Sequence, residues 1–169
     1  VIADDARGTI ATKEWGFVPP WAEDRSDFGF INARSETLTE KPTFREAFAK
    51  ESRDGFRMGR CVVPTDGFYE WVEKDGGKQP YRVAFPEDRP FAMAGLWAQW
   101  QPPGTQTGLD AFAGGGETTE PETVETFTIV TTEPNDTVAD LHHRMGVILD
   151  DADVDEWLTA DTERAAELL

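Results

Sequence analysis

Short apolar runs, several of which alternate with polar residues, predict a chain built largely of β-strands. The runs are Trp15–Val18, Met58–Val63, Phe68–Val72, Tyr81–Phe85, Phe91–Trp97 and Thr126–Thr131. Turn-forming residues separate them, as in Asp75–Gly77 and Pro86–Asp88. Short strands joined by tight turns indicate mostly antiparallel pairing.

Helical periodicity is found in three places. Apolar residues repeat at helical spacing within Thr43–Lys50, directly after Pro42. A second helix is expected after Pro134, and one or two acidic helices are expected in the tail, Asp151–Leu169. The chain is therefore predicted to have an α+β fold, with a mixed, mostly antiparallel, barrel-like β-sheet and flanking helices.

The length and composition fit a single domain over residues 1–169. The stretch 102–125 is rich in Gly, Thr, Pro and Glu and is expected to be a disordered surface insertion. No apolar run reaches the ~18 residues of a membrane span. One cysteine, Cys61, excludes a disulfide framework and a cysteine-based zinc site. We expect a cytoplasmic monomer that binds no metal, no cofactor and no membrane.

The charge of the chain is strongly negative and unevenly distributed. The 33 acidic and 16 basic residues give a net charge of −17, which repels polyanions at long range. Arginine is more frequent than lysine, and we interpret this acidic, lysine-poor composition as that of an extreme halophile's protein. Residues 41–60 form the one clearly positive window, so a polyanion is expected to bind there or at isolated bases near it.

The two histidines of the chain are adjacent, at His142 and His143. On an extended backbone alternate side chains share a face, so His142 and Arg144 would lie on one side and His143 on the other. Adjacent histidines lack the spacing of zinc ligands, and no thiolate supplements them. A catalytic imidazole and a capping or surface pair both remain possible.

Two further segments carry candidate chemistry. Asn32 and Arg34 would project to one face of an extended segment, where an amide and a guanidinium suit a phosphate or sugar oxygen; a turn followed by a helix cap is the alternative. Glu70 lies among aromatic residues, a setting typical of a general acid–base group. It could also lie on the solvated face of an edge strand.

The remaining candidates are aromatic residues and the thiol. Trp15 and Trp21 flank a turn stiffened by glycine and proline, and they form either a core cluster or a platform for nucleic acid bases. Cys61 has apolar neighbours in a predicted strand and no adjacent histidine. We therefore expect Cys61 to be a buried structural thiol.

Taken in order along the chain, seven segments resemble the SOS-response-associated peptidase (SRAP) family. The segments are Trp15–Pro19, Asn32–Thr37, Cys61–Trp71, Lys78–Tyr81, Ala94–Trp97, Phe127–Asn135 and His142–Leu149. The resemblance runs from about Trp15 to Leu158. It implies the fold of that family and its function, which is to shield abasic sites in single-stranded DNA.

The resemblance also implies a covalent reaction. In that family a cysteine becomes the N-terminus after removal of the initiator methionine, and its amine and thiol capture the ring-opened abasic site as a thiazolidine. By the match, Asn32 orients the N-terminal group or the sugar, and Glu70 moves protons at the amine and the imine carbon. His142 assists opening of the sugar ring. The full-length protein would thus be an enzyme of the crosslinking and autopeptidase type.

The implied partner is single-stranded DNA that contains abasic sites. Arg34 and Arg144 match the positions that hold the flanking phosphates. Trp15 or Trp21 would stack on a neighbouring base or wedge beside it. No cofactor is implied.

Two features depart from the family's pattern. Gly146 stands where the family has proline after His-x-Arg-Met. The chain begins at Val1 with 14 residues before Trp15, so we expect a truncated domain that lacks its first strand and its nucleophile. As written, this fragment is expected to be inactive. Two other functions remain open: a non-catalytic single-stranded-DNA-binding module and a thiol autopeptidase.

Overall fold

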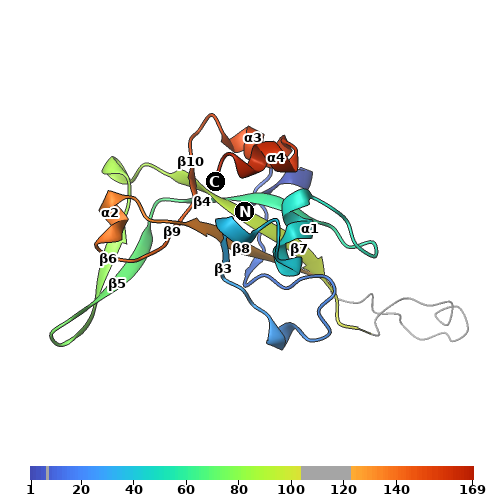
Figure 1. Cartoon of the computed structure of the whole chain (residues 1–169), viewed down its shortest axis with the longest axis horizontal. Helices are drawn as coiled ribbons and strands as arrows, with labels where there is room; N and C mark the ends of the chain where they lie inside the picture. Colours follow the sequence, from blue (N-terminus) through green and yellow to red (C-terminus); the bar gives the residue numbers. More distant parts are fainter. Residues whose placement is uncertain (7, 104–122) are drawn as a thin grey trace, which may run out of the picture.

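Three long antiparallel strands form the centre of the main sheet: β4 (Met58–Thr65), β7 (Phe91–Trp100) and β8 (Val124–Thr132). A computed structural model describes residues 1–6, 8–103 and 123–169 of the chain and shows these strands side by side (Figure 1). Short strands extend the sheet to give the order β1–β4–β7–β8–β2. The short strands are β1 (Ile2–Ala3), β2 (Glu14–Trp15), β3 (Asn32–Arg34), β9 (Met145–Gly146) and β10 (Ile148–Leu149).

The pairing of the short strands makes the sheet mixed. β2 and β3 run parallel to β8, whereas β9 on β8 and β10 on β7 are antiparallel. The predicted α+β class with a mostly antiparallel sheet is confirmed. The sheet is not closed, however, because β1 and β2 end the strand order as unpaired edges. The barrel-like expectation was wrong in this respect, because helices cover the apolar face that a closed barrel would have enclosed.

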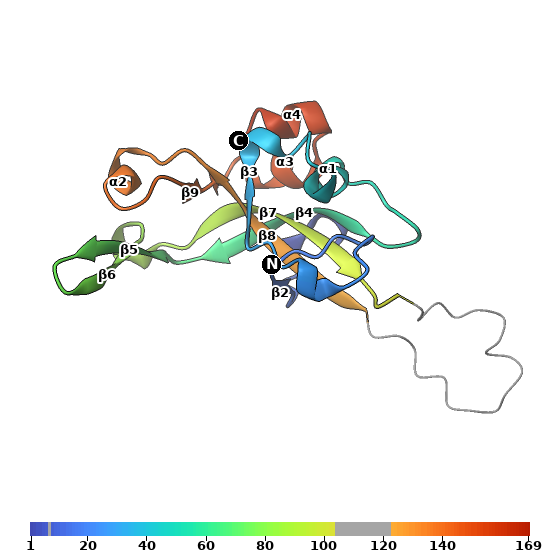
Figure 2. The same ribbon diagram turned by 60° about the horizontal axis from the view of Figure 1, so that its bottom comes forward.

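Helices α1 (Pro42–Ala49), α3 (Val154–Thr159) and α4 (Thr162–Ala166) lie on one face of the main sheet (Figure 2). Their apolar residues pack on the sheet to form the main core, in which Phe48 and Trp157 are fully buried. The predicted first helix and the two tail helices are thereby confirmed.

A separate hairpin projects from the main sheet. Strands β5 (Phe68–Lys74) and β6 (Gly77–Val83) pair with each other in a two-stranded sheet, and α2 (Asp136–Ala139) lies beside them (Figures 1 and 2). The turn between the strands contains Gly76, whose φ of 115° favours glycine. The predicted turn at this point and the predicted helix after Pro134 are confirmed.

The predicted strand Trp15–Val18 is shorter than expected. β2 ends at Trp15 because Gly16 has a φ of 129° and turns the chain, after which Phe17 makes an isolated bridge with Phe30. A Cβ atom on residue 16 would also come within 3.4 Å of the Gly29 backbone. The positive φ therefore favours glycine here, while a Cβ atom would only come into close contact with the neighbouring backbone.

The expected insertion at 102–125 lies mostly outside the described residues. Its last two residues, Val124 and Glu125, belong to β8, where they pair with β7. Four short 3₁₀ turns complete the described chain: η1 (Asp4–Ala6), η2 (Arg25–Asp27), η3 (Ser35–Thr37) and η4 (Pro86–Asp88). None of the described helices combines the length and apolar character needed to cross a membrane.

Candidate functional site

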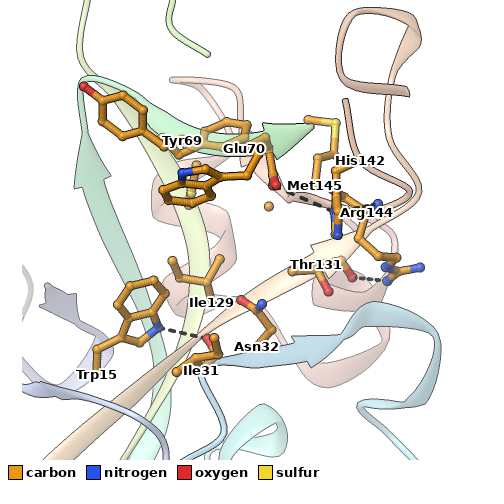
Figure 3. A pocket seen from close by; sticks show the side chains of 14 residues that line it. Trp15, Ile31, Asn32, Tyr69, Glu70, Ile129, Thr131, His142, Arg144 and Met145 are labelled. Carbon is orange, nitrogen blue, oxygen red and sulfur yellow. Dashed lines mark hydrogen bonds and ion pairs between the residues drawn. The ribbon is translucent and has the colours of Figure 1, made fainter. Parts of the chain in front are cut away.

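A cavity of about 320 Å³ lies between β5 of the hairpin and strands β2, β3, β8 and β9 of the main sheet (Figure 3). Five of the seven predicted site residues line it: Trp15, Asn32, Glu70, His142 and Arg144. These residues come from four segments that are far apart in the sequence. The remaining lining residues are Ile31, Phe68, Tyr69, Trp71, Met93, Ile129, Thr131, Met145 and Gly146.

Glu70 and His142 face each other across the cavity (Figure 3). The Glu70 Oε1 atom lies 3.8 Å from Nδ1 of His142, which is longer than a hydrogen bond but close enough for an ion pair if the imidazole is protonated. The Glu70 side chain is 21% exposed, so it is largely shielded from solvent. A carboxylate and an imidazole this close to each other can both act on the protons of one substrate bound in the cavity.

The backbone of residue 144 orients the His142 ring. Nδ1 lies 2.9 Å from the Arg144 carbonyl oxygen and 3.2 Å from the Arg144 amide nitrogen. Since Nδ1 is occupied in this way, Nε2 is the ring nitrogen left for a substrate. His143 is exposed and does not line the cavity, as predicted, but its ring lies beside that of His142, with ring centres 4.3 Å apart, and not on the opposite side.

Arg144 is held in a network of its own. Its guanidinium donates to both Glu36 carboxylate oxygens, at 2.5 and 2.9 Å, and to the Thr131 carbonyl at 2.6 Å. The hydrogen bond from Arg144 lowers the pKa of Glu36 to about 2. Nε of Arg144 is buried without a partner among the described residues. The Arg144 charge is therefore largely offset within the protein.

Strand β3 presents the second predicted pair. Its parallel pairing with β8 places Asn32 opposite Ile129; Ala33 is buried, while Asn32 and Arg34 are exposed on the other face. Asn32 reaches the cavity, but Arg34 lies beyond its rim. The predicted common face is confirmed, but of these two side chains only the Asn32 amide lines this cavity.

Trp15 forms one wall of the cavity. Its Nε1 atom donates to the Ile31 carbonyl at 2.9 Å, and one face of its ring is stacked with Phe127. The side chain is nevertheless 56% exposed, which is unusual for a large aromatic residue. The hydrogen bond fixes the ring in position and leaves apolar surface open beside the cavity.

The comparison with protein families agrees with this geometry. The family model described as SOS response associated peptidase (SRAP) matches residues 1–169. The chain belongs to the SRAP family. This confirms the resemblance drawn from the seven sequence segments.

Curated SRAP relatives are named as abasic site processing proteins. The abasic site processing protein YoqW of Bacillus subtilis (strain 168) is 37% identical over 160 residues, which are 94% of this chain and 61% of that protein. The abasic site processing protein HMCES of Gallus gallus is 32% identical, over 92% of this chain and 47% of its own length. The chain thus spans between about half and two thirds of the length of these relatives.

Solved structures share the SRAP fold. A crystal structure of a Bacteroides thetaiotaomicron protein has a TM-score of 0.71 and 30% identity, and covers 92% of this chain and 61% of that one. A Bordetella bronchiseptica protein has a TM-score of 0.70 and 28% identity, and covers 94% and 71% of the two chains.

Trp21 and Cys61, like Arg34, lie outside the SRAP cavity. Trp21 is 39% exposed and packs edge-on against Phe28 on another part of the surface. Cys61 is fully buried in β4, and burial raises the pKa of its thiol. The prediction of a buried structural thiol is confirmed. Among the described residues, no group of three or more His, Cys, Asp or Glu side chains could hold a metal ion.

Sequence reasoning missed the aromatic wall opposite Trp15. Trp71 is 56% exposed and Tyr69 is 55% exposed, and their rings lie 6.3 Å apart at the cavity. Both residues had been noted only as the surroundings of Glu70. Their spacing of two residues in a strand was the available signal, because it places both side chains on one face.

Proposed function

We propose that this SRAP domain processes abasic sites in single-stranded DNA and that the full-length protein becomes covalently linked to them. The observation that carries the proposal is the cavity itself. It collects Asn32, Glu70, His142 and Arg144 beside exposed aromatic surface, in a chain similar to abasic site processing proteins. A cavity of about 320 Å³ suits a sugar without a base.

The proposed reaction proceeds through an imine. The α-amine of an N-terminal cysteine adds to the aldehyde of the ring-opened sugar, and loss of water gives a Schiff base. The thiolate then adds to the imine carbon, and the nitrogen takes up a proton, which closes a five-membered thiazolidine. The amine and thiol belong to one residue, so ring closure has a high effective molarity.

The cavity supplies proton transfer for these steps. Glu70 accepts a proton from the attacking amine and returns one to the leaving water. His142 assists opening of the sugar ring through Nε2, since the backbone of residue 144 engages Nδ1. Asn32 orients the sugar or the N-terminal group through its amide.

The proposed DNA contacts lie in the cavity and on the surface around it. Arg34 binds a flanking phosphate with an exposed guanidinium. Arg144 also contacts a phosphate, but there it competes with Glu36. Trp15 stacks on a neighbouring base, and Trp21 on one further from the lesion.

A non-catalytic DNA-binding module is the second candidate. The observation that favours it is that the one cysteine of the chain, Cys61, is buried outside the cavity. Incubation of this chain with an abasic oligonucleotide should therefore yield no heat-stable adduct. An adduct formed by this chain would show that the nucleophile is another group, such as a lysine side chain or the Val1 amine.

The decisive test uses the full-length protein with its N-terminal cysteine. Glu70→Gln should slow crosslinking to an abasic oligonucleotide by about 10²–10⁴-fold, while binding of intact single strands changes little. His142→Ala should also slow the abasic-site reaction, and His143→Ala is its matched control because the neighbouring residue is exposed and does not line the cavity. An unchanged crosslinking rate in Glu70→Gln would remove Glu70 from the mechanism. Equal losses of rate in the two histidine variants would remove the specific role given to His142.

A further inference from the structure

Nearly every cation in residues 1–6, 8–103 and 123–169 is paired within the protein. Lysine and arginine side chains there bind carboxylates, carbonyls or a tyrosine hydroxyl, with four exceptions. The exceptions, which make no side-chain hydrogen bond or ion pair, are Arg34, Lys41, Arg45 and Lys78. In a chain of net charge −17, exposed cations without partners are scarce, so their location carries information.

Three of these four cations follow one another along a single segment. Thr37 Oγ1 donates to the Arg34 carbonyl at 3.4 Å, the Lys41 amide donates to the Thr37 carbonyl at 3.0 Å, and the Arg45 amide to the Lys41 carbonyl at 3.0 Å. Successive hydrogen-bonded turns therefore connect the three cations. Lys41, at the N-cap of α1, and Arg45 are four residues apart, which corresponds to about 6 Å along a helix axis.

Exposed aromatic rings lie against the same helix. Phe30 packs edge-on on Phe44 of α1 with ring centres 5.7 Å apart, and Phe28 and Trp21 continue the row at 6.0 and 5.3 Å. Phe30 is 41% exposed although it is a large apolar residue. An aromatic row beside unpaired cations is the combination that single-stranded nucleic acids bind.

This surface continues from the cavity. Phe30 precedes the cavity residues Ile31 and Asn32 in the chain, and Arg34 follows them. Two of the nearby carboxylates, Glu36 and Glu46, are already paired with arginines of their own. Glu40 is the one exposed carboxylate of residues 34–46 that lacks such a partner.

We propose that Arg34, Lys41, Arg45, Phe30 and Trp21 form an exit surface that binds the single strand where it leaves the cavity. Lys41 and Arg45 contact successive phosphates, while Phe30 and Trp21 stack against bases. The proposal rests on the proposed function and adds α1 to the DNA-binding surface. The basic window 41–60 expected from the sequence is reduced to these two residues, because Lys50, Arg53, Arg57 and Arg60 are engaged within the protein.

The test measures binding of this chain to two oligothymidylates, of about 4 and about 16 nucleotides, as a function of salt. The double variant Lys41→Ala, Arg45→Ala should bind the short strand like the wild type. On the long strand, its plot of log affinity against log salt should be less steep by about 1.4, since each lost phosphate contact removes about 0.7. A long strand offers the protein several overlapping binding positions. Their number is the same for every variant, so it does not affect the difference between their slopes.

Lys78→Ala is the matched control, because Lys78 is equally unpaired but lies in the β5–β6 hairpin. It should leave both slopes unchanged. The pair Lys41→Gln, Arg45→Gln keeps longer side chains on α1 and should behave like the alanine pair. The exit surface would be ruled out if Lys78→Ala changed the slope on the long strand as much as the double variants do, or if neither double variant changed it. Either result would leave the proposed function standing. Absence of wild-type binding to either strand at low salt would count against the proposed function and the exit surface together.

Discussion

The Arg144 guanidinium donates to Glu36, which is 108 residues away in the chain. The sequence pattern placed Arg144 on the same side as His142, and this is confirmed. It could not identify Glu36 as the partner, because Glu36 follows β3 while Arg144 precedes β9 and only the pairing of both strands with β8 brings them together. Local alternation predicts which way a side chain faces, but a contact across the sheet depends on strand order.

Glu36→Gln tests this ion pair through pH. The bound carboxylate has a pKa of about 2, below its ordinary value, so the pair stabilises the fold fully above the ordinary pKa and loses this contribution as the pH falls towards 2. At pH 7 we expect the variant to lose about 0.2–1 kcal/mol of unfolding free energy, a small value because Glu36 is half-exposed and screened. Urea unfolding should show this difference shrinking as the pH falls. Glu40→Gln, at an exposed and unpaired carboxylate, should show no comparable difference at pH 7.

At the scale of secondary structure, the periodic segments were predicted well and the irregular ones were not. The central strands and α1 have enough apolar residues at regular spacing for the sequence to show which are strands and which is a helix. β3 and β9 have two or three residues each and form only because β8 offers free backbone groups beside them. The extended backbone of Asn32–Arg34 could be predicted, but no local pattern identifies β8 as the partner of either strand, and two walls of the cavity depend on this pairing.

Arg60 joins three elements, although its place in the basic window had suggested a surface role. It is fully buried in β4 between the rings of Phe48 and Trp157, and it donates to the carbonyls of Phe48 in α1 and Ala160 after α3. Arg60→Ala should lower the unfolding free energy by about 3 kcal/mol, since two charge-assisted hydrogen bonds and side-chain packing are lost. Urea unfolding measures this loss.

Two variants separate packing from hydrogen bonding at Arg60. Arg60→Met keeps apolar contact with both rings, so it should cost less than Arg60→Ala. Arg57→Ala removes an exposed arginine from the residue before β4 and should cost less than about 1 kcal/mol. A loss in Arg57→Ala as large as that in Arg60→Ala would contradict the assigned role of the buried guanidinium.

At the scale of the whole molecule, the open sheet leaves the cavity between two bodies of structure. The hairpin provides Glu70, and the main sheet and the segment after α2 provide Asn32 and His142. Each of these residues can be identified as a candidate from its own segment. That they meet in one site was predicted only by the family resemblance. The strand order and the parallel pairing of β2 and β3 on β8 were not derivable from periodicity, because it carries no information on which strands become neighbours.

The net charge of −17 makes the salt dependence of DNA binding informative. Above about 0.1 M salt the Debye length is under ~10 Å, so long-range repulsion is screened and loss of the Arg34, Lys41 and Arg45 contacts dominates. Arg144 is not counted because Glu36 already neutralises it, so the other three contacts give a slope of about −2, or about 100-fold weaker binding from 0.1 to 1 M KCl. Below 0.1 M the repulsion reaches further and opposes the gain, so the plot of log affinity against log salt should flatten. Anisotropy titrations from 0.02 to 1 M KCl would measure both regimes.

The covalent complex should not follow this dependence, because a thiazolidine does not dissociate as ions are added. Full-length protein crosslinked to an abasic strand should stay attached at molar KCl, and its yield at long times should differ little between moderate and molar salt. Stacking on Trp15 still supports the encounter there, since it depends on apolar contact more than on charge. If the crosslink yield at long times fell with salt as steeply as reversible binding does, the claim that the covalent complex is independent of salt would be contradicted.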